Sequence, residues 1–310
     1  MPLILLLVPL PPAYERLLTE RYEVVRLAVD ELDGAHDACR RAQVVWTNGM
    51  VGLSEAAMTA LPNLQIVVCQ GVGYDAVDVA AASERGVAVA AGQGVNSTTV
   101  ADHAMALLLS LLRRTPRYDR DVRAGKWLEV RVLDPILTHK RVGVLGFGRI
   151  GQLVAQRAAG FDCEIVYHSR RPVADSPHAY AASPLELARQ CDALVLCCPG
   201  GPATHHLVDA EVLDALGPSG YLVNVARGSV VDTDALLAAL TDDRIAGAAL
   251  DVIEGEPEVA DAWRALDNVI FTPHTGGLST QAFDEMVRQG LASLDAHFTG
   301  ADTIPGRVEP

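Results

Sequence analysis

A glycine-rich loop between a strand-like and a helix-like stretch most constrains how this chain folds. Residues 142–145 (VGVL) are typical of a short buried strand, and G-x-G-x-x-G follows at Gly146, Gly148 and Gly151, ahead of a helical pattern at residues 152–159. The first glycine allows a tight turn, the second lets the backbone approach a pyrophosphate, and the third packs the helix on the strand. Because the helix N-terminus offers free N–H groups to phosphates, the loop predicts a dinucleotide site in an α/β domain.

Apolar runs alternate with helix-like stretches along the whole chain. Repeated βα units whose strands are almost continuously apolar indicate parallel sheets with helices on both faces. At 310 residues the chain also exceeds what one hydrophobic core usually supports. We therefore predict an α/β protein with two doubly wound parallel-sheet domains. The predicted strands are residues 3–8, 24–27, 44–46, 66–69 and 87–90, then 142–145, 164–168, 194–198, 221–225, 245–250 and 269–271, and the predicted helices of the first half are near 13–20, 33–41 and 77–85.

The last predicted helix, at residues 279–298, indicates how the two domains are connected. It carries an apolar face, but the βα series after the glycine loop leaves no obvious partner for it. We infer that the chain returns to its first domain, so that residues 1–97 and 278–310 form one discontinuous domain. Residues 98–277 form the other, and a cleft between two domains is where ligand sites are usually found.

Composition and charge argue against several kinds of partner. The chain has 39 acidic and 25 basic residues and a net charge of −14, whereas a nucleic-acid ligand needs a basic face. The apolar run at residues 2–8 is far shorter than the roughly 20 residues of a membrane helix, and it lacks the basic region and cleavage site of a signal peptide. Six cysteines without C-x-x-C spacing indicate reduced thiols. We therefore expect a cytoplasmic protein with no membrane or nucleic-acid partner.

Three late stretches of the chain supply the residue types that reduction of a 2-oxo acid requires. Each follows a predicted strand, at the end where open α/β sheets bind their ligands. Arg227 offers a planar fork of donors for a carboxylate, His274 is an acid that titrates near neutral pH, and Glu256 can hold that imidazole charged. Singly, such an arginine is more often part of a surface ion pair and such a histidine is more often structural. Together, behind a nucleotide-binding loop, they favour hydride transfer.

Further motifs accompany these residues in a fixed order. They are Gly71-Val72-Gly73 with Asp75, Val100-Ala101-Asp102-His103, Asn224-Val225-Ala226-Arg227-Gly228, Ala249-Leu250-Asp251-Val252 with Glu256-Pro257, and Pro273-His274 with Gly276-Gly277. With the glycine loop, they resemble the D-isomer-specific 2-hydroxyacid dehydrogenase family from about residue 45 to residue 298. The resemblance is greatest to its glyoxylate/hydroxypyruvate reductase and hydroxyphenylpyruvate reductase branch. It implies a flavodoxin-like substrate domain, a Rossmann nucleotide domain, and reduction of a small 2-oxo acid to the D-2-hydroxy acid by NAD(P)H.

The resemblance also implies a role for individual residues. Arg227 would hold the carboxylate and carbonyl of the substrate, His274 would donate a proton to the carbonyl oxygen, and Glu256 would keep His274 protonated. The substrate would also contact Asn48 and the backbone N–H groups of Val72 and Gly73. No metal is implied. The residues expected at the cofactor are Gly146, Gly148, Arg149, Ile150, Gly151, Ser169, Arg170, Arg171, Pro199, Thr204, Val225, Ala226, Asp251 and Gly276.

The end of the second Rossmann strand favours NADPH over NADH. An NAD site usually has Asp or Glu about 20 residues beyond the glycine loop, where it binds the ribose 2′-OH. This chain has Ser169, Arg170 and Arg171 there and no acid. A hydroxyl group and two guanidinium groups suit a 2′-phosphate.

Several alternatives remain beside this interpretation. A D-3-phosphoglycerate or D-lactate-type dehydrogenase has the same fold, and so does a non-catalytic, nucleotide-sensing protein of the co-repressor kind. The chain departs from the family at His139, where glycine is usual, and at Asp102, where glutamate is common. A homodimer is expected from the family, formed through the apolar helix at residues 98–113 and the polar segment at 115–140.

Overall fold

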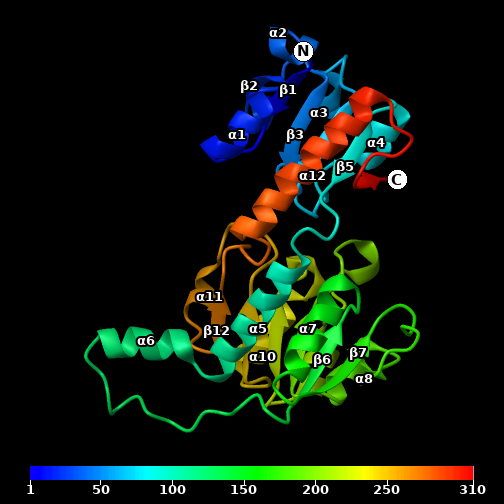
Figure 1. Ribbon diagram of the computed structural model, residues 1–310. Helices are drawn as coiled ribbons and strands as arrows, with labels where there is room; N and C mark the ends of the chain where they lie inside the picture. Colours follow the sequence, from blue (N-terminus) through cyan, green and yellow to red (C-terminus); the bar gives the residue numbers. More distant parts are fainter. Residues whose placement is uncertain (310) are drawn as a thin grey trace. The chain divides into compact units, whose positions relative to one another are not determined.

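The computed structural model describes residues 1–309, and its contacts divide the chain into two compact units (Figure 1). The first unit comprises Met1–Asn96 together with the chain from Leu278 onward, and the second comprises Ser97–Gly277. The first of the boundaries expected from the sequence, after residue 97, differs from this division by one residue. Each unit has its own parallel sheet and its own core, as the predicted fold class requires.

The sheet of the first unit has the strand order of flavodoxin-like folds. Its strands lie in the order β13-β5-β4-β3-β1-β2, and all the pairs among β1 to β5 are parallel. Without β13 this is the order 2-1-3-4-5, which is typical of the flavodoxin-like arrangement. The short strand β13 joins the edge of β5 in the antiparallel direction, and the sequence analysis did not predict it. The strands are β1 (Leu3–Leu6), β2 (Glu23–Arg26), β3 (Val44–Asn48), β4 (Ile66–Gln70), β5 (Ala88–Ala91) and β13 (Arg307–Val308).

Helices cover both faces of this sheet. α1 and α12 pack on one face around Trp46, whereas α2, α3 and α4 pack on the other. The returning helix α12 lies against β4 and β5, and its Gly290 makes room for the buried indole, because a Cβ there would lie 2.4 Å from Cη2 of Trp46. The helices are α1 (Pro12–Thr19), α2 (Asp37–Arg41), α3 (Glu55–Thr59), α4 (Val79–Glu84) and α12 (Thr280–Thr299).

The sheet of the second unit has the strand order of a Rossmann fold. Its strands lie in the order β12-β11-β10-β9-β6-β7-β8, and every pair is parallel. The direction of winding reverses between β6 and β9, which is where doubly wound sheets bind their ligands. The strands are β6 (Arg141–Leu145), β7 (Glu164–His168), β8 (Ala179–Tyr180), β9 (Ala193–Leu196), β10 (Tyr221–Asn224), β11 (Gly247–Leu250) and β12 (Val269–Phe271).

The helices of the second unit also form two layers. α5 and α7 share one core with one face of the sheet, and α8, α9 and α10 share the other (Figure 1). α5 is apolar on more than one side because it packs against α7, β10 and β11 of its own unit. The helices are α5 (Ser97–Leu112), α6 (Thr115–Arg123), α7 (Arg149–Ala159), α8 (Pro184–Arg189), α9 (Ala210–Leu216), α10 (Thr233–Thr241) and α11 (Asp261–Arg264).

The observed elements differ from the predicted ones mainly where apolar periodicity is weak. α6 lies in the segment that we had described only as polar, and it buries none of its residues. Ion pairs one turn apart support it instead, at 3.7 Å between Arg117 and Asp121 and at 2.9 Å between Arg123 and Asp119. α2 is also shorter than expected, since residues 33–36 lie outside the helix.

The two positions that depart from the family pattern have structural explanations. His139 has a φ of 63°, a left-handed conformation that glycine adopts without strain. Asp102 of α5 accepts a hydrogen bond of 2.5 Å from Nε of Arg157 in α7, so its negative charge joins two helices of the same core.

Two expectations about solubility and thiols can be compared with the structure. Among the helices of residues 1–309, none is long and apolar enough to span a membrane. All six cysteines are free thiols, and burial raises the pKa of Cys69 to about 12 and that of Cys198 to about 11. The thiols of Cys69 and Cys198 are therefore protonated and unreactive at neutral pH.

Candidate active site

The residues predicted to carry the chemistry follow three adjacent strands of the second unit. Arg227 comes after β10, Glu256 follows β11, and His274 follows β12. These strands are neighbours in a parallel sheet, so their carboxyl ends meet at one edge. The sheet topology thus brings the three stretches together although 47 positions separate Arg227 from His274 in the sequence.

His274 and Glu256 form a direct hydrogen-bonded pair. Nδ1 of His274 lies 2.8 Å from Oε1 of Glu256, and the two side chains are 30% and 26% exposed. The ring is therefore anchored on one nitrogen and accessible to a ligand. His274 has a φ of 52°, and its backbone N–H donates to the carbonyl oxygens of Asp251 and Thr272. A non-glycine residue in this conformation indicates that the turn is held by its surroundings.

The buried carboxylate of Asp251 holds that turn. Its Oδ1 accepts hydrogen bonds from the Thr272 hydroxyl (2.6 Å) and the Thr275 N–H (2.9 Å), and its Oδ2 accepts one from the Gly276 N–H (2.8 Å). Nε2 of His103, on α5, lies 3.3 Å from Oδ1. Burial alone would raise the pKa of Asp251, but the hydrogen bonds from His103, Thr272 and the two backbone groups outweigh it and lower the pKa to about 2.

This role of Asp251 was not predicted from the sequence. The family resemblance implies Asp251 on the nicotinamide side and Gly276 at the cofactor, and the structure shows in addition that the Asp251 carboxylate accepts a hydrogen bond from the Gly276 N–H. A Cβ on Gly276 would lie 2.7 Å from Oδ2 of Asp251, so the contact requires glycine. His103 and Thr272 were also missed as supporting residues. The motif around His103 was the only available signal, and it does not reveal the contact with Asp251.

Arg227 lies in an extended segment whose position is fixed by hydrogen bonds and close packing with neighbouring residues. The buried Asn224 side chain donates to the Arg227 carbonyl (3.0 Å) and accepts from the Ala226 N–H (3.0 Å). Gly200 lies under the arginine side chain, since a Cβ there would be 2.7 Å from Cγ of Arg227. Gly228 packs as tightly on the backbone of Ile253. The guanidinium donates to the Ala226 carbonyl (2.8 Å), and the side chain is partly exposed at the strand ends.

The glycine loop has the conformation that a phosphate-binding turn requires. Gly146 has a φ of 94°, and a Cβ there would lie 2.4 Å from the backbone N of Cys198. A Cβ on Gly151 would lie 2.1 Å from the Gly146 carbonyl oxygen, so the third glycine allows α7 to approach the loop. Gly148 faces open space, and Arg149 and Ile150 begin α7 beside it. The loop therefore leaves its backbone accessible where a pyrophosphate would bind.

The turn after β7 presents two exposed arginines. Arg170 and Arg171 are both exposed, and the Ser169 hydroxyl donates to the Arg171 carbonyl (2.7 Å). Behind them Tyr167 stacks on Phe147 of the glycine loop, with ring centroids 4.0 Å apart. A buried aromatic pair thus joins the turn after β7 to the glycine loop.

The remaining expected cofactor residues lie at the ends of β9 and β10. The Thr204 hydroxyl donates to the Pro199 carbonyl at 2.7 Å, which closes the loop after β9. Val225 and Ala226 are buried directly after β10. These residues flank the point at which the sheet reverses its winding.

The expected substrate residues of the first unit lie in two loops that touch. Oδ1 of Asn48 accepts the backbone N–H groups of Met50 (3.0 Å) and Val51 (2.8 Å), so this side chain shapes the turn after β3. Val72 and Gly73 follow β4, and Gly49 packs against Gly73, with 2.6 Å between a Cβ on Gly49 and the Gly73 carbonyl carbon. All of them lie at the carboxyl edge of their sheet.

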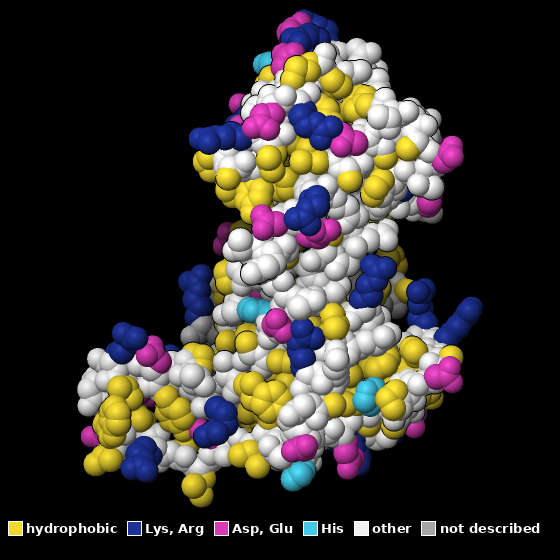
Figure 2. Space-filling view, in the orientation of Figure 1, with side chains coloured by type: hydrophobic (Ala, Val, Ile, Leu, Met, Phe, Trp, Pro, Cys, Tyr) yellow, Lys and Arg dark blue, Asp and Glu magenta, His cyan; other side chains and the backbone are white. Residues whose placement is uncertain are grey.

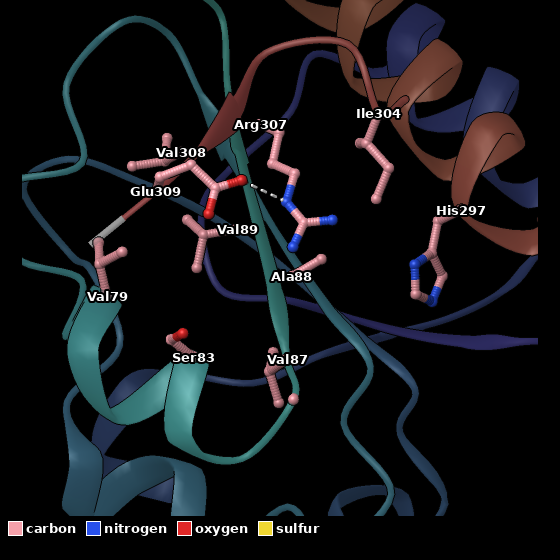
Figure 3. A pocket seen from close by; sticks show the side chains of 11 residues that line it. Val79, Ser83, Val87, Ala88, Val89, His297, Ile304, Arg307, Val308 and Glu309 are labelled. Atoms are coloured by element: carbon pink, nitrogen blue, oxygen red, sulfur yellow. Dashed lines mark ion pairs between the residues drawn. The ribbon is translucent and has the colours of Figure 1, made fainter. Parts of the chain in front are cut away.

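A pocket elsewhere in the first unit has no such chemistry. It lies beside β5 and α4 and is lined mostly by apolar side chains, together with His297 and the Arg307–Glu309 ion pair at 2.8 Å (Figure 3). None of the residues predicted for catalysis, substrate or cofactor lines this pocket.

A known protein family matches most of the second unit. The model of the D-isomer-specific 2-hydroxyacid dehydrogenase NAD-binding domain matches residues 105–276. This range includes the glycine loop and all three proposed catalytic side chains. A nucleotide-binding oxidoreductase is thus indicated by both the sheet order and the family match.

Full-length relatives extend the likeness to the whole chain. A glyoxylate/hydroxypyruvate reductase A from Arabidopsis thaliana is 38% identical over 306 residues, which cover 97% of each chain. A hydroxyphenylpyruvate reductase from Plectranthus scutellarioides is 38% identical over 96% of each chain. The crystal structure of an NADPH-dependent glyoxylate/hydroxypyruvate reductase from Sinorhizobium meliloti, in complex with NADP and malonate, superposes with a TM-score of 0.90 at 36% identity, covering 100% of this chain and 99% of that one.

The chain belongs to the D-isomer-specific 2-hydroxyacid dehydrogenase family, and it is an oxidoreductase with an NAD-binding Rossmann domain. Its likeness is to the branch of glyoxylate/hydroxypyruvate and hydroxyphenylpyruvate reductases, as the sequence motifs predicted.

Replacing Asp251 with Asn tests whether this carboxylate holds the turn. One acceptor oxygen becomes an NH₂ donor facing a backbone N–H, so we expect the free energy of unfolding to fall by about 2–4 kcal/mol. Urea unfolding followed by circular dichroism measures the loss. Asp192→Asn is the matched control, since Asp192 accepts one backbone hydrogen bond from Arg141 at a more exposed site and should cost less than about 1 kcal/mol. Equal losses in the two variants would contradict a special role for Asp251.

Proposed function

We propose that this enzyme reduces a small 2-oxo acid of the glyoxylate or hydroxypyruvate type to the D-2-hydroxy acid. The observation that carries the proposal is the His274–Glu256 pair, 2.8 Å apart, at the same sheet edge as Arg227. An acid–base pair next to a guanidinium group suits a substrate that has a carbonyl beside a carboxylate. The names of the relatives support the same substrate class.

Each residue of the proposed site has one task in the reaction. A bound nicotinamide cofactor supplies the hydride that reduces the carbonyl carbon. Nε2 of His274, the ring nitrogen away from Glu256, donates the proton that the carbonyl oxygen requires. Glu256 stabilises the positive charge of the imidazolium and fixes the ring, and Arg227 binds the substrate carboxylate and orients the carbonyl. In the reverse direction the same imidazole accepts the hydroxyl proton.

The geometry of the loops supports the proposed cofactor contacts, and the family resemblance supports the proposed substrate contacts of the first unit. Gly148 and the first N–H groups of α7 are accessible for the pyrophosphate, and the loop from Pro199 to Thr204 is proposed at the nicotinamide. Asn48 and the backbone N–H groups of Val72 and Gly73 are proposed substrate contacts.

The first experiment is to follow NADPH and NADH oxidation with glyoxylate, hydroxypyruvate, phenylpyruvate and pyruvate offered separately. We expect turnover with glyoxylate or hydroxypyruvate, and a fall of about 10²–10⁴-fold in kcat for His274→Ala, the usual contribution of a general acid. Ala also releases the turn, so His274→Asn, which keeps the size and tolerates a positive φ, is the matched variant. Unchanged turnover in both variants would refute the role of His274. Nucleotide binding without turnover on any oxo acid would favour a nucleotide-sensing protein.

We further propose that the cofactor is NADPH. Arg170 and Arg171 are exposed beside Ser169, where a carboxylate would repel a 2′-phosphate and none is present. Charge-assisted hydrogen bonds contribute about 1.5–3 kcal/mol each, although exposure to solvent reduces this value. The double variant Arg170→Ala, Arg171→Ala should therefore raise the KM for NADPH about tenfold or more and leave the KM for NADH nearly unchanged. Arg189→Ala, which removes an exposed arginine of α8, is the control. An equal loss for both cofactors would exclude this assignment.

A homodimer is proposed through α6 and the segment that follows it. Large apolar side chains are exposed there, including Trp127 (67%), Leu128 (69%) and Leu133 (100%), and Figure 2 shows hydrophobic side chains gathered over this region. Such a cluster is typical of an interaction surface. α5 contributes less to this argument than the sequence suggested, because its apolar sides are buried within its own unit.

Charged substitutions in this segment should separate the dimer. We expect Leu133→Asp combined with Ile136→Asp to halve the molar mass measured by light scattering. Each new carboxylate would be buried without a partner at the proposed interface, which is unfavourable. Leu17→Asp, at an exposed apolar position of α1, should leave the mass unchanged. A wild-type mass equal to one chain would end the proposal.

A further inference from the structure

Two adjacent histidines and a glutamate, none of which the proposed chemistry uses, meet in loops of the second unit. His205 and His206 follow the short 3-10 turn Pro202–Thr204, and Glu254 follows β11. One imidazole nitrogen of each histidine and one carboxylate oxygen all lie within 4.8 Å of one another. His205 is exposed, and the other two are partly exposed, so ions in solution have access to all three.

The backbone turns both histidines toward the same side. Neighbouring side chains of an extended segment point in opposite directions, but His206 has a φ of 51°, in the left-handed region. The two imidazole rings stack as a result, with centroids 3.9 Å apart and an interplanar angle of 24°. The His206 N–H donates to the Ser229 carbonyl at 2.8 Å, which fixes this conformation. The chain thus adopts a strained conformation that groups two ligand-type side chains.

Glu254 is held in place opposite these rings. Its Oε2 accepts a hydrogen bond from the Thr233 hydroxyl at 2.6 Å, and its Oε1 lies 3.1 Å from Nε2 of His206. Asp232 is also near, with Oδ2 3.9 Å from Nδ1 of His206. Burial would raise the pKa of Glu254, but the hydrogen bonds from Thr233 and His206 outweigh it and keep the pKa below its ordinary value. At neutral pH the side chain is therefore the carboxylate that can bind a cation.

These three groups match the ligand preferences of one class of ion. Imidazole nitrogen and carboxylate oxygen together suit zinc and its neighbours among the transition metals, whereas calcium and magnesium prefer oxygen alone. Around a tetrahedral zinc ion with bonds of about 2.1 Å, ligand atoms lie roughly 3.4 Å apart. The His206–Glu254 distance of 3.1 Å already corresponds to this spacing, and rotation of the exposed His205 ring can bring the third atom closer.

We propose that His205, His206 and Glu254 bind one divalent transition-metal ion of the zinc class, with water in the remaining position. The ion takes the place of the hydrogen bond between Nε2 of His206 and Oε1 of Glu254. It also ties the loop after β9 to the loop after β11, which are the loops that carry Thr204 and Glu256. The site is distinct from the His274–Glu256 pair and does not require the proposed reaction.

Metal binding is measured on the full-length chain without a histidine tag, by calorimetry with ZnCl₂ and by the visible absorption of Co²⁺ as a spectroscopic probe. We expect one ion per chain and the d–d bands of a tetrahedral site without a thiolate charge-transfer band. Zn²⁺ should also raise the melting temperature, because it binds only the folded loops. His205→Ala should weaken binding at least about tenfold, as the loss of a ligand does. This variant should fold normally, because His205 is exposed. The ring contact that it loses is with His206, which is itself partly exposed.

Two further variants separate this site from other metal-binding groups. Glu254→Gln keeps the shape of the side chain and should weaken binding as His205→Ala does. His139→Asn removes an exposed histidine elsewhere in the same unit, and His274→Asn removes the proposed catalytic one; neither should alter the affinity. Unchanged affinity in His205→Ala and Glu254→Gln, or a loss confined to His274→Asn, would overturn the proposal. If the metal binds only at millimolar concentration and no variant changes its affinity, the ion is adventitious and the proposal is wrong.

Discussion

The edge of the second unit that carries the proposed catalytic residues depends on the buried carboxylate of Asp251. Its oxygens accept the Thr272 hydroxyl and the backbone N–H groups of Thr275 and Gly276, so the turn after β12 has a fixed shape. That shape places His274 in a left-handed conformation with its ring on Glu256. Because His103 of α5 lies against the same carboxylate, the first helix of the unit is fixed to this edge as well. An ionised group with so many donors remains charged across the physiological pH range.

The sequence predicted the fold wherever a periodic apolar signal was long enough. The strands β6, β7 and β10 have four or five residues and are largely buried, and each was expected within a residue or so of its place. β8 and β13 have two residues each, too few to show a period. α6 is stabilised by ion pairs one turn apart and buries no residue, so its pattern looked like that of a polar loop.

For the site, residue types and strand ends were sufficient to select Arg227, Glu256 and His274 as one group, since parallel strands end at a common edge. Contacts that depend on the exact course of a turn could not be predicted. The hydrogen bonds of Asp251, the positive φ of His274 and the stacking of His205 on His206 all belong to this kind. The same holds for His139. Its left-handed conformation, which glycine adopts without strain, could not be predicted from the sequence.

The proposed acid, its carboxylate partner and the proposed substrate arginine follow three adjacent strands of one sheet, β12, β11 and β10 respectively. The supporting contacts of His103, Thr272 and Asn224 lie within the same unit. The residues proposed for proton transfer therefore belong to one continuous stretch of the chain, Ser97–Gly277. The proposed substrate contacts of Asn48, Val72 and Gly73 lie in the other unit, so substitutions there would leave the His274–Glu256 pair unchanged, and substrate preference and proton transfer could change separately.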